Sequence, residues 1–154
     1  DPEMSRGLGD VYKRQMPSYC VSRALQLVQK IDPSKLNVTI LGLAFRGGVS
    51  DTRLSPTYAL IAELRKHGVN RMIIHDPLVS EDPTLSNDLV LTSNLDDALK
   101  GSDLVILVAD HPEYKKIGRD QLGNIPIYDG RGILNRTDTR LNYAVLGVRK
   151  DIKE

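Results

Sequence analysis

The chain has very little cysteine: Cys20 is the single one among 154 residues. One cysteine cannot form a disulfide within the chain, and it excludes a metal site built from several cysteines. Proteins without disulfides are typical of the reducing interior of the cell, so we expect a cytoplasmic protein.

Long hydrophobic runs are missing too. No stretch approaches the eighteen or so apolar residues of a membrane helix, so we expect no membrane span. The first fifteen residues, DPEMSRGLGDVYKRQ, lack the apolar stretch of a secretory signal peptide. We interpret residues 1–15 as a non-native or disordered tail and exclude them from the fold.

The chain has no large excess of charge of either sign. Lys and Arg number 21 against 20 Asp and Glu, which gives a net charge of +1. Because nucleic-acid binding usually requires a clear cationic excess, we expect no nucleic-acid partner. The 40% hydrophobic and 27% charged residues are typical of a soluble globular protein, and the length suits one domain plus an appendage.

The sequence does contain helical and extended patterns that alternate along the chain. Apolar residues recur every three or four positions from Pro17 to Ile31, which predicts a helix within residues 16–32, ahead of a domain over residues 33–150. The expected strands are KLNVTILGL, RMIIHDP, LVLT, SDLVILVAD, IPIYDG and NYAVLGV. The expected helical segments are PTYALIAELRK, NLDDALKG, HPEYKKI and RDQLG, with Ser55 and Asn94 as N-caps. This alternation predicts an α/β fold: a Rossmann-like, doubly wound parallel sheet covered by helices on both faces.

Polar residues gather in the loops that follow the strands: FRGGVSDTR, HDP, ADHPEY and DGRG. Sheets of this kind bind ligands at the carboxyl ends of their strands, so we expect Arg46, Arg53 and Arg131 to lie at one edge. A guanidinium donates two parallel hydrogen bonds to phosphate oxygens, which suits a diphosphate. Neither G-x-G-x-x-G nor a P-loop is present, however, and ordinary solvated loops remain an equal alternative on these residues alone.

A resemblance favours the phosphate interpretation. GLAFRGGVSDTRLSP is similar to the GLAFK-x-x-T-D-D-x-R-x-SP signature of the UDP-glucose/GDP-mannose dehydrogenase family, in its C-terminal, UDP-binding domain. HDP, LDDALKGSDLVILVADHPEY and IYDGRGIL follow in the family's order, and MPSYC resembles the start of its linking helix. The resemblance covers roughly residues 16 to 150. Asp110-His111 resembles the Asp-His of the UDP-N-acetylmannosamine branch of the family.

The resemblance implies a function and roles for four residues. Family members use NAD to oxidise the C6 alcohol of a nucleotide sugar to a carboxylate, as part of polysaccharide biosynthesis. Phe45, Arg46 and Arg131 are then expected to bind the UDP-sugar substrate, and Arg53 is expected to reach the NAD pyrophosphate. No catalytic residue and no metal ligand are expected within this chain.

Two departures from the family pattern stand out. Val49 and Ser50 replace the usual Thr and first Asp of the signature, and the G-G-x-C-x-x-K-D segment that holds the family's nucleophilic cysteine has no counterpart. We therefore expect a fragment that is inactive by itself and lacks the N-terminal NAD-binding domain and the central dimerisation domain. The full-length enzyme is expected to be a homodimer.

Several polar residues have simpler interpretations. Cys20 lies on the apolar face of the predicted helix, where a free cysteine acts as a small hydrophobe rather than a nucleophile. For Asp110-His111 we favour capping of the next helix over ligand binding. Asp76 could bind a ribose hydroxyl at the end of the second predicted strand. The proline that follows it, Pro77, indicates that the first role of Asp76 is in a turn.

Two other functions stay open from the sequence. The chain could be a free-standing module that senses a nucleotide without catalysis, in which case it should bind UDP tightly. It could also be an assembly domain whose N-terminal helix supplies the contact, in which case it should have no affinity for nucleotides.

Overall fold

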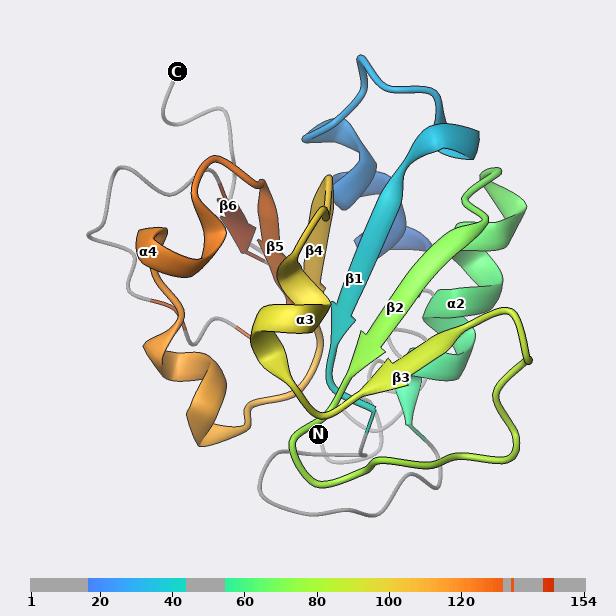
Figure 1. Ribbon diagram of the computed structural model, residues 1–154. Helices are drawn as coiled ribbons and strands as arrows, with labels where there is room; N and C mark the ends of the chain where they lie inside the picture. Colours follow the sequence, from blue (N-terminus) through green and yellow to red (C-terminus); the bar gives the residue numbers. More distant parts are fainter. Residues whose placement is uncertain (1–16, 44–54, 132–133, 135–142, 146–154) are drawn as a thin grey trace, which may run out of the picture.

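A six-stranded parallel sheet forms the centre of the molecule (Figure 1). The computed structural model describes residues 17–43, 55–131, 134 and 143–145. The strand order is β3-β2-β1-β4-β5-β6, which is the order of a doubly wound Rossmann sheet and confirms the predicted fold class. The strands are β1 (Asn37–Leu41), β2 (Arg71–His75), β3 (Val90–Thr92), β4 (Leu104–Leu107), β5 (Ile127–Asp129) and β6 (Tyr143–Val145).

Strand β1 stands at the middle of this order, between β2 and β4. Its last residue, Leu41, is in register with His75 of β2 and with Leu107 of β4. The chain winds outward in one direction through β2 and β3 and in the other through β4, β5 and β6. The loops that leave β1 and β4 therefore diverge at the point where ligands bind in such sheets.

One face of the sheet is covered by the helix over residues 17–26 and by α2 (Pro56–Lys66). Cys20 belongs to this core with 3% exposure, so the interpretation as core filler is confirmed. The helix ends earlier than predicted, since residues 27–30 form turns with bonds such as Leu27 N–H to Ala24 O, 3.0 Å. The apolar periodicity continues past residue 26 because Val28 remains buried in the same core.

The opposite face is covered by shorter helical elements. They are α3 (Leu95–Leu99), η2 (Pro112–Lys116) and α4 (Arg119–Leu122), and Figure 1 shows α3 in front of the sheet. A further short turn, η1 (Pro33–Lys35), leads into β1. Because helices cover both faces, the central strand β4, LVIL, is apolar throughout and all four of its residues are buried.

The helix starts follow the predicted capping residues. The Ser55 hydroxyl accepts a bond from Thr57 N–H at 3.1 Å, and Pro56 is the first residue of α2. The Asn94 side chain accepts from Asp97 N–H at 2.9 Å and begins α3. Both predictions are confirmed.

Within the described residues, no helix combines the length and the apolar character needed to cross a membrane. The same part of the chain contains no group of three or more His, Cys, Asp or Glu side chains that could hold a metal ion.

The two loops at the centre of the sheet approach each other closely at Gly42. This residue has φ +118°, and a Cβ atom on it would lie 2.5 Å from Ala109 Cβ and 3.0 Å from Ala109 N. Glycine is thus required here both for its backbone conformation and for the close approach of the loop that leaves β4.

The Gly42→Ala substitution should lower the free energy of unfolding by about 3 kcal/mol, through left-handed strain and displacement of Ala109. Gly101→Ala is the matched control, since Gly101 has φ +77° but nothing within 4 Å of the added Cβ. It should cost about 1 kcal/mol. Urea unfolding of both variants gives the comparison, and equal costs would contradict a tight contact at Ala109.

Candidate functional site

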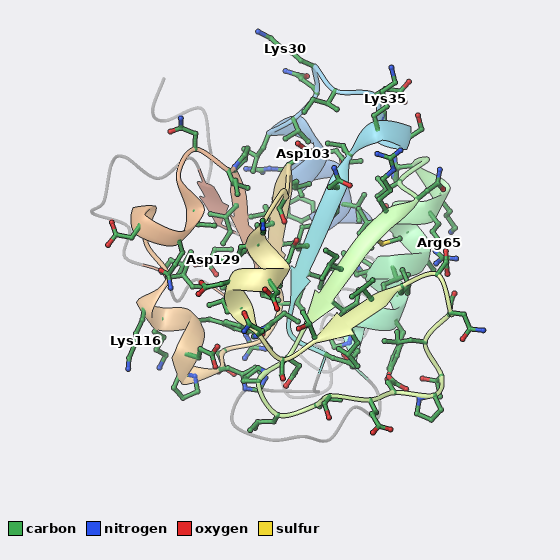
Figure 2. The ribbon with its side chains drawn as sticks, in the orientation of Figure 1. Lys30, Lys35, Arg65, Asp103, Lys116 and Asp129 are labelled. Carbon is green, nitrogen blue, oxygen red and sulfur yellow. The ribbon has the colours of Figure 1, made fainter. Side chains whose placement is uncertain are left out.

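The candidate site lies at the carboxyl edge of the sheet, where the loops after β1, β2, β4 and β5 emerge. In Figure 1 this is the lower edge, toward which the arrows of β1 and β2 point. Figure 2 shows Lys30, Lys35 and Asp103 at the opposite, amino edge. Of the four residues that the sequence assigned to ligands, Phe45, Arg46 and Arg53 lie outside the described residues, and Arg131 lies at the carboxyl edge.

Asp76 is the central acidic residue of this edge and is fully buried. Its Oδ1 accepts a bond from Leu78 N–H at 2.8 Å, which confirms the predicted turn after β2. Its Oδ2 accepts from Leu43 N–H, also at 2.8 Å. The carboxylate therefore connects the loop after β2 to the loop after β1.

His111 brings the loop after β4 to the same carboxylate. Its Nε2 lies 3.1 Å from Asp76 Oδ2, and since a carboxylate only accepts, Nε2 carries the proton. His111 also occupies the N-cap position of η2, but its side chain makes no capping hydrogen bond. The capping role favoured for this histidine was wrong, because the imidazole is buried toward Asp76 instead of turning back to the helix.

A second buried group packs beside this pair. The Nδ1 atom of His75 is 2.7 Å from the Tyr114 hydroxyl, and its Nε2 is 3.2 Å from the carbonyl oxygen of Ser93. The Tyr114 ring contacts both imidazoles, with centroids 5.5 Å from His75 and 5.4 Å from His111. Because the Ser93 carbonyl can only accept, Nε2 of His75 is protonated, and Nδ1 of the neutral ring is an acceptor. The single hydroxyl proton of Tyr114 is shared between this nitrogen and the carbonyl oxygen of His75, 3.1 Å away.

Burial shifts the titration of this group. Burial lowers the pKa of His75, and the Ser93 carbonyl and the Glu113 carboxylate oppose this only in part. Burial also raises the pKa of Tyr114 far above its usual range, so its hydroxyl remains a hydrogen-bond donor.

Arg131 is presented by a tight turn after β5. Asp129 is fully buried and accepts from Arg131 N–H at 3.0 Å and from Leu134 N–H at 2.9 Å. Gly130 N–H donates to Leu107 O of β4 at 2.9 Å. The backbone at Arg131 is thus fixed to the sheet while its side chain is exposed.

The guanidinium of Arg131 faces the loop after β4. Its terminal nitrogen lies 3.3 Å from Asp110 Oδ2, with the two side chains 37% and 39% exposed. Sequence reasoning missed both this pair and the Asp76–His111 pair. The available signal was that each of these residues follows shortly after an apolar strand, but neither pairing follows from that position.

Since folding lowers the pKa of His75 from its ordinary value of 6.5, the unfolded chain takes up a proton first as the pH falls. The stability due to neutral His75 should therefore be lost below about pH 6.5, by up to about 1.4 kcal/mol per pH unit. Urea unfolding between about pH 7 and pH 5 tests this. His75→Gln should be less stable at pH 7 but less dependent on pH, and an unchanged slope would contradict the assignment.

The chain is similar to a known family of proteins. Residues 39–136, more than half of the chain, match the UDP binding domain of the UDP-glucose/GDP-mannose dehydrogenase family. The UDP-N-acetyl-D-mannosamine dehydrogenase of Pyrococcus horikoshii is 29% identical over 139 residues, which are 86% of this chain and 31% of that protein. The enzyme of the same name from Methanocaldococcus jannaschii is 29% identical over 128 residues, 79% of this chain and 28% of its own length.

Solved structures agree with this match. The UDP-D-ManNAc dehydrogenase of Pyrococcus horikoshii has a TM-score of 0.71 and 27% identity over 87% of this chain and 31% of its own. An NDP-N-acetyl-D-galactosaminuronic acid dehydrogenase from Methanosarcina mazei has a TM-score of 0.74, and its 20% identity over 86% of this chain and 29% of its own supports the fold alone. The chain spans about a third of the length of such relatives. With its ordered motifs, strand order and matched domain, the chain belongs to the UDP-glucose/GDP-mannose dehydrogenase family, as its UDP-binding domain.

Proposed function

We propose that the carboxyl edge of this sheet binds the diphosphate of a UDP-sugar, within an NAD-dependent dehydrogenase that oxidises the sugar C6 alcohol to a carboxylate. The observation that carries the proposal is the exposed guanidinium of Arg131, which stands on a turn anchored by Asp129 at the edge where such sheets bind ligands.

The geometry around Arg131 suits an anionic ligand. Because Asp129 and Leu107 fix the turn backbone, little main-chain freedom has to be lost when a phosphate binds. The pair with Asp110 is exposed on both sides, and such pairs contribute only about 0–1 kcal/mol. The contact with Asp110 involves one terminal nitrogen of a guanidinium that carries five N–H donors, so a diphosphate can bind the other nitrogens while Asp110 stays in place.

Residues of the segment after β1 complete the proposed site. We assign Phe45 and Arg46 to the substrate, with Arg46 on the diphosphate or sugar. Arg53 contributes to the NAD pyrophosphate, which a guanidinium suits because it donates two parallel bonds to phosphate oxygens. NAD, when bound, accepts the hydride.

The contribution of this domain to the reaction is positioning. The nucleophilic cysteine, the main NAD-binding domain and a dimerising central domain belong, in this proposal, to the rest of the enzyme, which acts as a homodimer in the cytoplasm in polysaccharide biosynthesis. A substrate of the UDP-N-acetylmannosamine type is favoured by the names of the relatives and by Asp110-His111.

Isothermal titration calorimetry of UDP into this chain tests the proposal. Arg131→Ala should weaken UDP binding at least roughly tenfold, since it removes a charge-assisted contact worth about 1.5–3 kcal/mol. Arg131→Lys should recover only part of the affinity, because an ammonium lacks the planar fork.

Arg65→Ala is the matched control. Arg65 is also an exposed arginine paired with an aspartate, Asp88 at 3.0 Å, but it lies in the last turn of α2 (Figure 2). Its loss should leave UDP binding unchanged. Equal effects of the two alanine variants, or no UDP binding by the wild-type chain, would contradict the proposed site.

A further inference from the structure

We infer that Asp76 is a positioning residue for the diphosphate site, and this inference rests on the proposed function. Its buried carboxylate holds the loop after β1 and the loop after β4 at a fixed separation, and through the second loop it fixes the place of the Asp110–Arg131 pair. Neither the turn that follows β2 nor the cap of η2 requires this connection.

Burying the negative charge of Asp76 costs free energy. Asp76 is fully buried, and a buried carboxylate is tolerated only when donors surround it. Leu43 N–H, Leu78 N–H and His111 Nε2 supply such bonds at 2.8, 2.8 and 3.1 Å. These donors come from three separate loops, after β1, β2 and β4, so the carboxylate joins all three.

Asp76 connects these loops at the centre of the sheet. Leu43 and His111 follow β1 and β4, the neighbouring strands between which the winding of the sheet reverses. Gly42, the residue before Leu43, and Ala109, two residues before His111, approach each other closely. The carboxylate thus binds both loops within one or two residues of this close approach.

His111 connects Asp76 to the edge of the sheet where the ligand is proposed to bind. His111 is buried, so its imidazole determines the course of the backbone at the start of η2. The preceding residue, Asp110, contacts the guanidinium of Arg131 at 3.3 Å. A displacement of His111 would move Asp110, and with it the orientation of Arg131. Small errors in the placement of a binding group can cost much of its contribution.

The Asp76→Asn substitution tests this inference because an amide nitrogen replaces one acceptor oxygen. The amide nitrogen cannot accept, so in one orientation of the amide Leu78 loses its bond, and in the other Leu43 loses its bond and His111 must change tautomer. The matched control is Thr39→Val, which removes a buried hydroxyl bond to Ala98 O at 2.7 Å in the middle of β1. Ser102 also donates to that carbonyl, at 3.1 Å, so the carbonyl should keep a hydrogen-bond partner in the control.

Two measurements separate positioning from stability. In the ligand-free chain, amide hydrogen exchange should show loss of protection at Leu43 or at Leu78 in Asp76→Asn. Where Leu43 loses protection, the ¹H–¹⁵N signals of Asp110 and Arg131 should shift, and Thr39→Val should show none of these changes. At a temperature where all the proteins are fully folded, Asp76→Asn should bind UDP at least roughly tenfold more weakly, and Thr39→Val should bind as wild type.

Substitutions of His111 provide the second variant pair if Asp76→Asn does not fold. His111→Gln keeps an N–H donor at the position of Nε2 and should retain most of the UDP affinity, whereas His111→Leu should lose as much as Asp76→Asn. Equal affinities of the two His111 variants would overturn the inference, and so would wild-type UDP affinity in a folded Asp76→Asn that has lost protection at Leu43.

The ligand-free measurement distinguishes the two proposals. If the wild-type chain binds no UDP, the proposed function fails. The spectra of Asp76→Asn or His111→Leu still decide whether the Asp76 carboxylate fixes the position of the Asp110–Arg131 pair. Unchanged signals of Asp110 and Arg131 in these variants overturn the positioning role whatever UDP does.

Discussion

The contact between two loops at the middle of the sheet is the constraint on which the rest of this structure depends. Gly42 and Ala109 meet where the winding of the sheet reverses, at a separation that leaves no room for a Cβ atom on Gly42. Asp76 reinforces the contact by accepting bonds from Leu43, next to Gly42, and from His111, two residues after Ala109. Backbone geometry and a buried charge therefore act on the same two loops, and the edge they form is determined before any ligand arrives.

This arrangement suits the positioning role that the proposed function gives to the domain. A parallel sheet buried on both faces provides a rigid frame, and its carboxyl edge presents side chains from loops that are far apart in sequence. Arg131 is exposed, yet its backbone is tied to Asp129 and Leu107. A charged group on a fixed backbone binds an anion at a lower entropic cost than one on a free loop.

The sequence predicted the features that depend on local interactions. Ser55 and Asn94 begin helices because their side chains bond to backbone two or three residues away, and the apolar runs become the buried strands. The pairing of His111 with Asp76, 35 positions away, depends on which strands become neighbours, so no local pattern contained it. His111 was misassigned as a cap for the same reason. The roles given to Arg46 and Arg53 stay predictions, since both lie outside the described residues.

A titration of the ¹⁵N-labelled chain with UDP, followed by ¹H–¹⁵N spectra, tests the central claim most directly. If the diphosphate binds at the carboxyl edge, the largest shift changes should fall on the loops after β1, β4 and β5, at Leu43, His111 and Arg131. Changes centred on the amino edge, near Lys35 and Asp103, or no changes at millimolar UDP, would contradict the account.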